Sequence, residues 1–210
     1  MLNSTLLLGF IAASLVVLMI PGPGVLYVVA RSAAQGYLAG FASVLGLSAG
    51  ALLHVVAAAI GLSALLLTSA TAFGIVKAIG AGYLIYLGIR TLFAKRPTAN
   101  MKPPPRLTLY RLFMDGVVIS IFNPKIAVFF LAFLPQFVDP ALGAVTEQVL
   151  LLGLLYVGLA LLTDGTYALL AGSLRHWLSG PVMQGPLPRY LSGGIYIGLG
   201  VKAALTDRPH

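Results

Sequence analysis

Apolar residues fill long runs of this chain, and polar residues gather in the short stretches between the runs. A helix needs about 20 predominantly apolar residues to cross the hydrocarbon core of a bilayer. Six runs reach that length to within a few residues. We therefore predict an all-α membrane protein with six spanning helices, over residues 5–30, 40–67, 73–93, 112–137, 148–174 and 187–205.

The fourth run carries Asn123, Pro124 and Lys125 near its middle. A lysine at the centre of a spanning helix costs about 2.5–3.5 kcal/mol. The Leu, Ile, Val and Phe residues of the run each favour insertion by about 0.3–0.6 kcal/mol, and together they outweigh this cost. Lys125 lies too far from either end of the run for its side chain to reach water. We therefore expect a group at mid-membrane that binds its charge.

The composition agrees with a chain that lies almost entirely in the membrane. Of the 210 residues, 59% are hydrophobic and 9% are charged, whereas soluble domains contain about 25% charged residues. The N-terminal run has no Lys or Arg before Arg31 and is too long for a signal peptide, so we interpret it as the first span. Cysteine is absent, which excludes disulfides and thiolate metal sites, and we expect no metal and no cofactor.

The basic residues predict the orientation. The net charge of +8 resides largely in loops, where it orients a membrane protein and does not indicate nucleic-acid binding. The connection 94–111 is predicted to be a cytoplasmic linker that is extended over its proline-rich run 101–106, whereas Asp139 and Glu147 place the connection between the fourth and fifth spans outside. Both termini then lie outside. The basic residues around the linker are Arg90, Lys95, Arg96, Lys102, Arg106 and Arg111.

An internal repeat relates the third and sixth predicted spans. Residues 77–90 match residues 189–202, with glycine at both members of the pairs 82/194 and 88/200. Two halves of three spans each, about 5–93 and 112–205, would then have opposite orientations within one transporter domain, 1–210. Inverted repeats of this kind are typical of secondary transporters. The alternative is that helix packing alone selects the small residues.

Proline motifs interrupt the first and fourth spans. Gly22 and Asn123 are residue types that cap helix N-termini, and Pro23 and Pro124 suit the first helical position. Each motif predicts the start of a half-helix inside the membrane, whose free N–H groups are tolerable only next to a cavity. A simple kink is the alternative at each place.

Two further ionisable residues lie inside predicted spans. Asp164 lies in the fifth span, where such residues are commonly functional; its pairing with Lys125 is left open, and a purely structural ion pair is the alternative. His54 lies at the centre of the second span, where it either relays protons or hydrogen-bonds a neighbouring helix as a neutral side chain. The candidate binding and transport residues are Gly22, Pro23, Gly24, Asn123, Pro124, Lys125 and Asp164, with Asp164 and His54 as candidate proton relays.

The motifs together resemble a known family. They comprise residues 19–24 followed by Gly36, Tyr37 and Gly40, residues 121–125 followed by 129–130 and 133–137, and the glycine pattern 80–88. This set is similar to the lysine-exporter (LysE) family, especially its homoserine/threonine-efflux (RhtB) branch, over essentially the whole chain. The resemblance implies a bacterial inner-membrane exporter of amino acids or related small metabolites, driven by the membrane gradient. It does not identify the substrate.

The residues themselves are compatible with a secondary transporter that works by alternating access. Half-helix N-termini and Lys125 would bind the carboxylate of an amino acid, and this anion would relieve the repulsion between Lys125 and the positive dipole end beside it. Asp164 would bind the ammonium group or carry a coupling proton, as in an antiporter.

Other functions fit the residues less well. A metal or cation permease and a channel remain alternatives, and an enzyme is not expected because no serine lies in a strained catalytic turn. The expected partners are a small-molecule substrate, protons and the lipid bilayer, with no nucleic acid. A homo-oligomer is left open.

Overall fold

The computed structural model describes residues 4–68 and 105–173, together with a few single positions elsewhere. The predicted spans 73–93 and 187–205, the repeat between them and most of the linker lie outside the described residues. Within the two described ranges all regular secondary structure is helical. The predicted helical class is therefore confirmed, and the six-helix inverted repeat stays a prediction.

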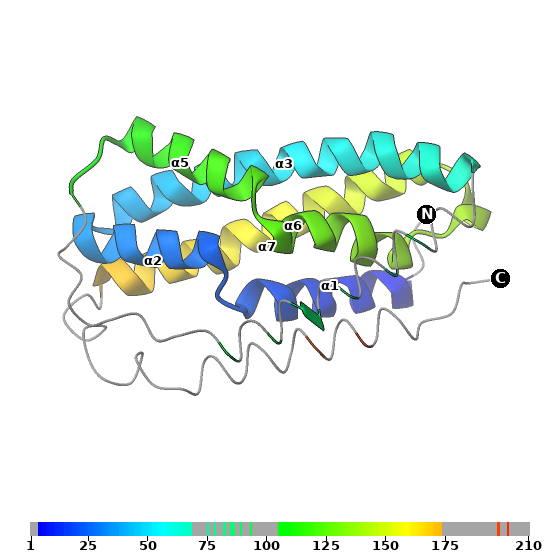
Figure 1. Ribbon diagram of the computed structural model, residues 1–210, viewed down its shortest axis with the longest axis horizontal. Helices are drawn as coiled ribbons and strands as arrows, with labels where there is room; N and C mark the ends of the chain where they lie inside the picture. The colour runs from blue at the N-terminus through cyan, green and yellow to red at the C-terminus, as the bar shows by residue number, and fades with distance from the viewer. Residues whose placement is uncertain are drawn as a thin grey trace.

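The described helices form an elongated bundle (Figure 1). Two of them, α3 and α7, are each long and apolar enough to cross a membrane. Figure 1 shows α1 and α2 following one another along the bundle, as α5 and α6 do. The elements are α1 (Ser4–Met19), α2 (Pro23–Gln35), α3 (Tyr37–Thr68), α5 (Leu109–Ile121), α6 (Pro124–Val128), the π-helical turn η1 (Phe129–Phe133), the 3-10 turns η2 (Leu134–Phe137) and η3 (Pro140–Leu142), and α7 (Val145–Ser173).

Both predicted helix breaks are present. The chain bends by 55° between α1 and α2 and by 46° between α5 and the segment that starts at Pro124. If each bent pair is one span, the described residues hold four spans, which match the first, second, fourth and fifth predicted spans to within several residues. Gly22 caps α2 and Asn123 caps α6, with a proline at the start of each helix. The prediction that each motif begins a new helix is confirmed, and the position of these helix starts inside the membrane stays a prediction.

Helix α5 begins three residues earlier than the predicted span. The Thr108 hydroxyl accepts a hydrogen bond from the backbone N–H of Arg111 at 3.2 Å, so Thr108 is the N-cap and the helix starts at Leu109. A threonine cap satisfies an N–H group that the first helical turn leaves free. Residues 109–111 of the predicted linker 94–111 are therefore helical, which moves the start of the fourth span by three residues.

The end of the fourth span is irregular in a way that the sequence analysis did not predict. The backbone N–H of Leu134 donates to the carbonyl of Phe129, which makes a wide π-helical turn over η1. Pro135 follows directly in η2, and it has no N–H to continue an α-helix. This wide turn carries three large aromatic side chains into the bundle.

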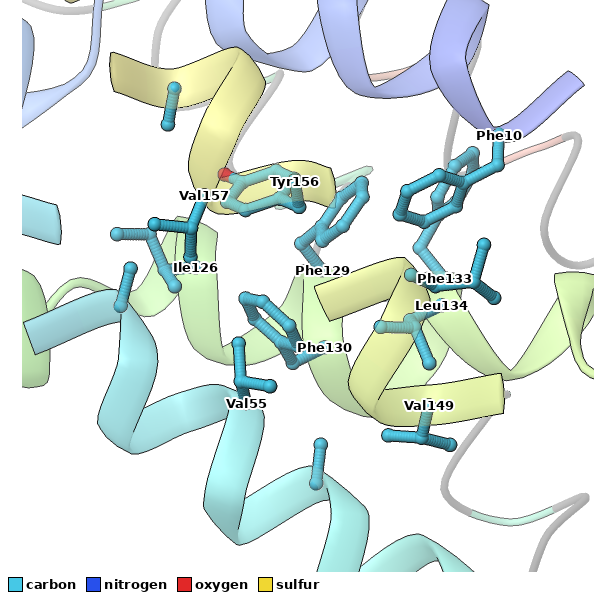
Figure 2. Packing of buried hydrophobic residues seen from close by; sticks show 14 of the residues in the cluster. Phe10, Val55, Ile126, Phe129, Phe130, Phe133, Leu134, Val149, Tyr156 and Val157 are labelled. Carbon is cyan, nitrogen blue, oxygen red and sulfur yellow. The ribbon is translucent and has the colours of Figure 1, made fainter. Parts of the chain in front are cut away.

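These aromatic side chains form the centre of the core (Figure 2). Phe129 packs against Tyr156 of α7, with ring centroids 4.4 Å apart, and against Phe10 of α1 at 5.9 Å. Phe130 meets Tyr156 edge-on at 5.2 Å. Each such pair contributes about 0.5–1.5 kcal/mol beyond the area it buries. The cluster therefore joins α1, η1 and α7 on one side of the helix breaks.

Helices α3 and α5 approach each other at their backbones on the other side of the breaks. A Cβ atom added to Gly50 would lie 2.5 Å from the Cβ of Ser120, and one added to Gly116 would lie 2.6 Å from the carbonyl oxygen of Ser43. A Cβ added to Gly46 would collide with the carbonyl of Phe113. Glycine is thus required at this interface because any side chain would separate the two helices.

Candidate functional site

A small cavity of about 30 Å³ lies beside the two helix breaks. Its polar lining comes from three elements: Ser48 of α3, Asn123 and Lys125 at the start of α6, and Tyr156 and Asp164 of α7. About 10–15 Å³ is needed for one water molecule, so the cavity has room for about two waters and not for an amino acid. A substrate of that size requires the surrounding helices to move apart.

The side chain of Lys125 lines the cavity and extends to the C-terminal end of α1. Its side chain is 6% exposed, and its ammonium group donates to the carbonyl of Ile20 at 3.0 Å and to that of Val17 at 3.3 Å. The C-terminal end of a helix carries a partial negative charge that attracts a cation. In this structure the long side chain of Lys125 extends to the end of α1, and the expected anion between Lys125 and its own half-helix stays a prediction.

The prolines explain why these carbonyls accept side-chain donors. In a regular helix the carbonyl of residue i accepts from the N–H of residue i+4, but Pro21 and Pro23 have no N–H. The carbonyls of Val17 and Met19 therefore lose their i+4 donors, although the Val17 carbonyl still accepts from the backbone N–H of Ile20 at 3.3 Å. Lys125 donates to the first, and the Tyr167 hydroxyl of α7 donates to the second at 3.0 Å.

The second break follows the same rule. Pro124 cannot donate to the carbonyl of Ser120, and His54 Nε2 of α3 lies 3.1 Å from that oxygen. Because a carbonyl only accepts, we assign the proton to Nε2. The imidazole also stacks on Phe130, with ring centroids 6.2 Å apart. His54 thus binds a neighbouring helix and does not line the cavity, while its role as a proton relay stays a prediction.

Asp164 has a free acceptor at the cavity. The residue is 9% exposed, and its Oδ1 atom has no hydrogen-bond partner in the part of the chain that the structure describes. Within the same part, Arg111 and Asp115 form the sole ion pair shorter than 4.0 Å. Asp164 and Lys125 therefore share one cavity without pairing directly, which answers the question that the sequence left open.

The structure brings most of the predicted site residues together. Gly24, Asn123, Lys125 and Asp164 line the cavity. A Cβ atom on Gly22 would lie 3.3 Å from both Cε and Nζ of Lys125, so this glycine leaves room for the lysine side chain. Pro23 and Pro124 start the half-helices and do not line the cavity.

Sequence reasoning missed several contributors to the site. Ser48 was not identified, and Tyr156 and Tyr167 could not be separated from the other tyrosines inside the spans. One signal was available for Tyr167. Two prolines, Pro21 and Pro23, predict two carbonyls without their usual i+4 donors, which can accept from side chains of other helices.

A second polar cluster ties α2 to the start of α5. The Tyr27 hydroxyl donates to the Asp115 carboxylate at 3.0 Å, which also pairs with Arg111 at 2.9 Å. Gln35 donates to the backbone carbonyl of Leu107 at 2.9 Å and accepts from its N–H at 3.0 Å. We call these contacts the linker-end clamp. The spacing of Arg111 and Asp115, four residues apart on one helix, could have indicated the ion pair.

Comparison with known proteins identifies the family to which this chain is similar. A family model described as LysE type translocator matches residues 15–207. No solved structure matches the chain.

The chain is also similar to several curated membrane proteins. A membrane protein of Vibrio cholerae is 30% identical over 197 residues, which cover 94% of this chain and 95% of the relative. A homoserine/homoserine lactone efflux protein of Salmonella typhimurium is 34% identical over 161 residues, covering 77% of this chain and 78% of the relative. A leucine efflux protein of Salmonella choleraesuis is 28% identical over 131 residues, covering 62% of each.

Proposed function

The chain belongs to the LysE-type translocator family, and from this membership we propose that it exports amino acids or related small metabolites across the bacterial inner membrane. It is a membrane protein by family and by its long apolar helices. The two relatives named as efflux proteins handle homoserine, homoserine lactone and leucine by their names. They support a small substrate of the amino-acid type.

The observation that carries the proposal is the buried pair of opposite charges at one cavity. Lys125 and Asp164 both line it, and neither neutralises the other directly. An ionised group at the centre of a spanning helix costs about 2.5–3.5 kcal/mol before it finds a partner. A zwitterionic amino acid carries both complementary charges. We therefore propose that Lys125 binds the substrate carboxylate, close to the N–H groups at the start of α6.

Asp164 is proposed to couple transport to protons. Its free Oδ1 atom is available either to a proton or to the ammonium group of the substrate. A carboxyl that gains and loses a proton as the cavity changes sides would link export to the proton gradient. The alternative role, ammonium binding alone, predicts different effects of an asparagine substitution.

Alternating access is supported by a correspondence between the two breaks. Met19 lies four residues before Pro23, and Ser120 lies four residues before Pro124. Their carbonyls are bonded by Tyr167 of α7 and His54 of α3 respectively. We infer that α1–α3 and α5–α7 are equivalent units.

Residues that line the cavity also correspond between the two units when the prolines and the two side-chain donors are aligned. Gly24 and Lys125 directly follow the two prolines, while Ala51 and Asp164 lie three residues before His54 and Tyr167. All four residues line the cavity, as expected if it lies between two inverted halves. Rocking of these halves would expose the cavity to each side in turn.

The remaining architecture is proposed on the same basis. One domain, 1–210, would contain an inverted pair of repeats at about 5–93 and 112–205. The linker would face the cytoplasm, and the linker-end clamp would then lie at the cytoplasmic end of the bundle.

Purified protein in proteoliposomes tests the function. We expect a panel of amino acids to reveal at least one substrate whose transport is accelerated by a pH gradient and abolished by Lys125→Met. Tyr110→Phe, a change at a tyrosine that is 74% exposed, is the matched control and should transport normally. A flux of inorganic cations that does not saturate with cation concentration, with no amino-acid transport, would instead indicate a channel or cation permease.

A further inference from the structure

The end of α1 holds a primary ammonium group in this structure. The ammonium of Lys125 donates to the backbone carbonyls of Val17 and Ile20 at 3.3 and 3.0 Å. These acceptors belong to a helix end with a partial negative charge. Leu18, which lies between them in the sequence, lines the cavity, so this helix end is within reach of a molecule in the cavity.

The local sequence builds this arrangement from the backbone. Pro21 cannot donate to the carbonyl of Val17, which leaves a lone pair for another donor. Gly22 has no side chain, and a Cβ atom there would lie 3.3 Å from Lys125 Nζ. The break thus supplies both the acceptors and the space for a tetrahedral ammonium group.

We propose that the carbonyls of Val17 and Ile20 form the ammonium subsite of the transporter, and that Lys125 occupies it only while the substrate is absent. This inference rests on the proposed function and names the group that the subsite binds. The ammonium of a lysine and that of an α-amino acid are the same chemical group, with one positive charge and three N–H donors. When the substrate ammonium binds the α1 carbonyls, the flexible side chain of Lys125 turns to the substrate carboxylate.

The exchange leaves each group that takes part in it with a hydrogen-bond partner. Without substrate, the ammonium of Lys125 donates to both carbonyls, and the Val17 carbonyl also accepts from the backbone N–H of Ile20 at 3.3 Å, so neither carbonyl is left without a donor. With substrate, the carbonyls receive a new ammonium group and Lys125 receives an anion. Asp164 does not take part in the exchange and stays available for a proton. The substrate must then carry a free primary amino group, because an N-acylated amine has neither the charge nor the three donors.

Removing the lysine ammonium and supplying a small replacement tests the subsite. Thermal unfolding of purified Lys125→Ala is measured in methylammonium, tetramethylammonium and sodium chloride at equal ionic strength, with the wild-type protein alongside. We expect methylammonium to raise the melting temperature of Lys125→Ala by several degrees over the other salts. The wild-type protein, whose subsite is occupied, should respond equally to all three salts.

Tyr167→Phe is the matched control, because it removes the donor of the neighbouring Met19 carbonyl and keeps Lys125. It should show no preference for methylammonium. Lys125→Gln is a second variant, and methylammonium is supplied to both lysine variants from cell disruption onward. Failure of both variants to fold even then would overturn the proposal, because the added ion should replace the missing group.

Other results would also overturn it. An equal response of Lys125→Ala to sodium would indicate a general cation site, and an equal response to tetramethylammonium would indicate a salt effect. The unfolding assay needs no transport, so its outcome is separate from that of the proposed function. Amino-acid export without methylammonium rescue would reject the subsite alone.

Discussion

Replacing Asp164 by asparagine tests whether its carboxylate is needed for transport or for the stability of the fold. The Oδ1 atom has no hydrogen-bond partner among the described residues, so the substitution breaks no hydrogen bond through that oxygen. A charge at a helix centre costs about 2.5–3.5 kcal/mol before it finds a partner, and the neutral amide avoids part of this cost. We expect the melting temperature to stay the same or to rise by about 2–4 °C for each kcal/mol recovered in a chain of this size.

Proton-driven transport should decrease in the same variant, although its stability does not. In proteoliposomes, Asp164→Asn should lose export driven by a pH gradient and retain exchange of labelled for unlabelled substrate, because the coupling proton has no carrier. If Asp164 only binds the substrate ammonium, both activities should fall together.

Asp115→Asn is the matched control. Asp115 accepts from Tyr27 and pairs with Arg111, so its neutral variant should be less stable by about 1 kcal/mol and should keep proton coupling. A lower melting temperature for Asp164→Asn with normal pH-driven export would refute the reasoning, because the carboxylate would then be structural.

Further predictions concern the breaks, the close interface and the topology. Tyr167→Phe leaves the Met19 carbonyl without its side-chain donor and should lower stability by about 1 kcal/mol, measured by thermal unfolding; an unchanged melting temperature would mean that water or another group replaces the hydroxyl. Gly50→Ala should push α3 away from α5 and reduce transport, whereas Gly61→Ala, at a position where a Cβ atom would have no described residue within 4 Å, should be silent in the same flux assay. Single cysteines at Thr98 and Asp139 should label from opposite sides of the membrane, with Thr98 on the cytoplasmic side, and labelling of both from outside intact cells would contradict six spans.

The features that the sequence predicted are those set by local chemistry. Proline and the N-cap residues Gly22 and Asn123 determine where a half-helix begins, whatever surrounds it. The cost of burying Lys125 and Asp164 marks them as unusual without any knowledge of their neighbours. The breaks could therefore be predicted, as could the burial of two charged residues beside them, whereas the transport role of these residues stays a prediction.

The features that the sequence did not predict depend on contacts between distant segments. The side chain of Lys125 could have pointed toward either side of the break, and only the position of α1 determines that it reaches Ile20. The linker-end clamp depends on the packing of α2 beside α5. The π-helical turn at η1 directly precedes the turn that contains Pro135 and carries the aromatic cluster, and apolar periodicity alone does not distinguish it from a regular helix.

The glycine contacts between α3 and α5 have a consequence for the speed of the transport cycle. Gly46, Gly50 and Gly116 bring these backbones together at the half of the bundle next to the linker. If His54 corresponds to Tyr167 and Pro124 to Pro23, the equivalent contact in the other half lies between α7 and α1. The residues equivalent to Gly46, Gly50 and Gly116 are then Leu159, Thr163 and Leu15. Separating closely packed backbones loses many contacts at once, whereas longer side chains can keep some contact as helices move. We therefore expect unequal activation barriers for the two openings, with separation of α3 from α5 as the rate-limiting step of turnover.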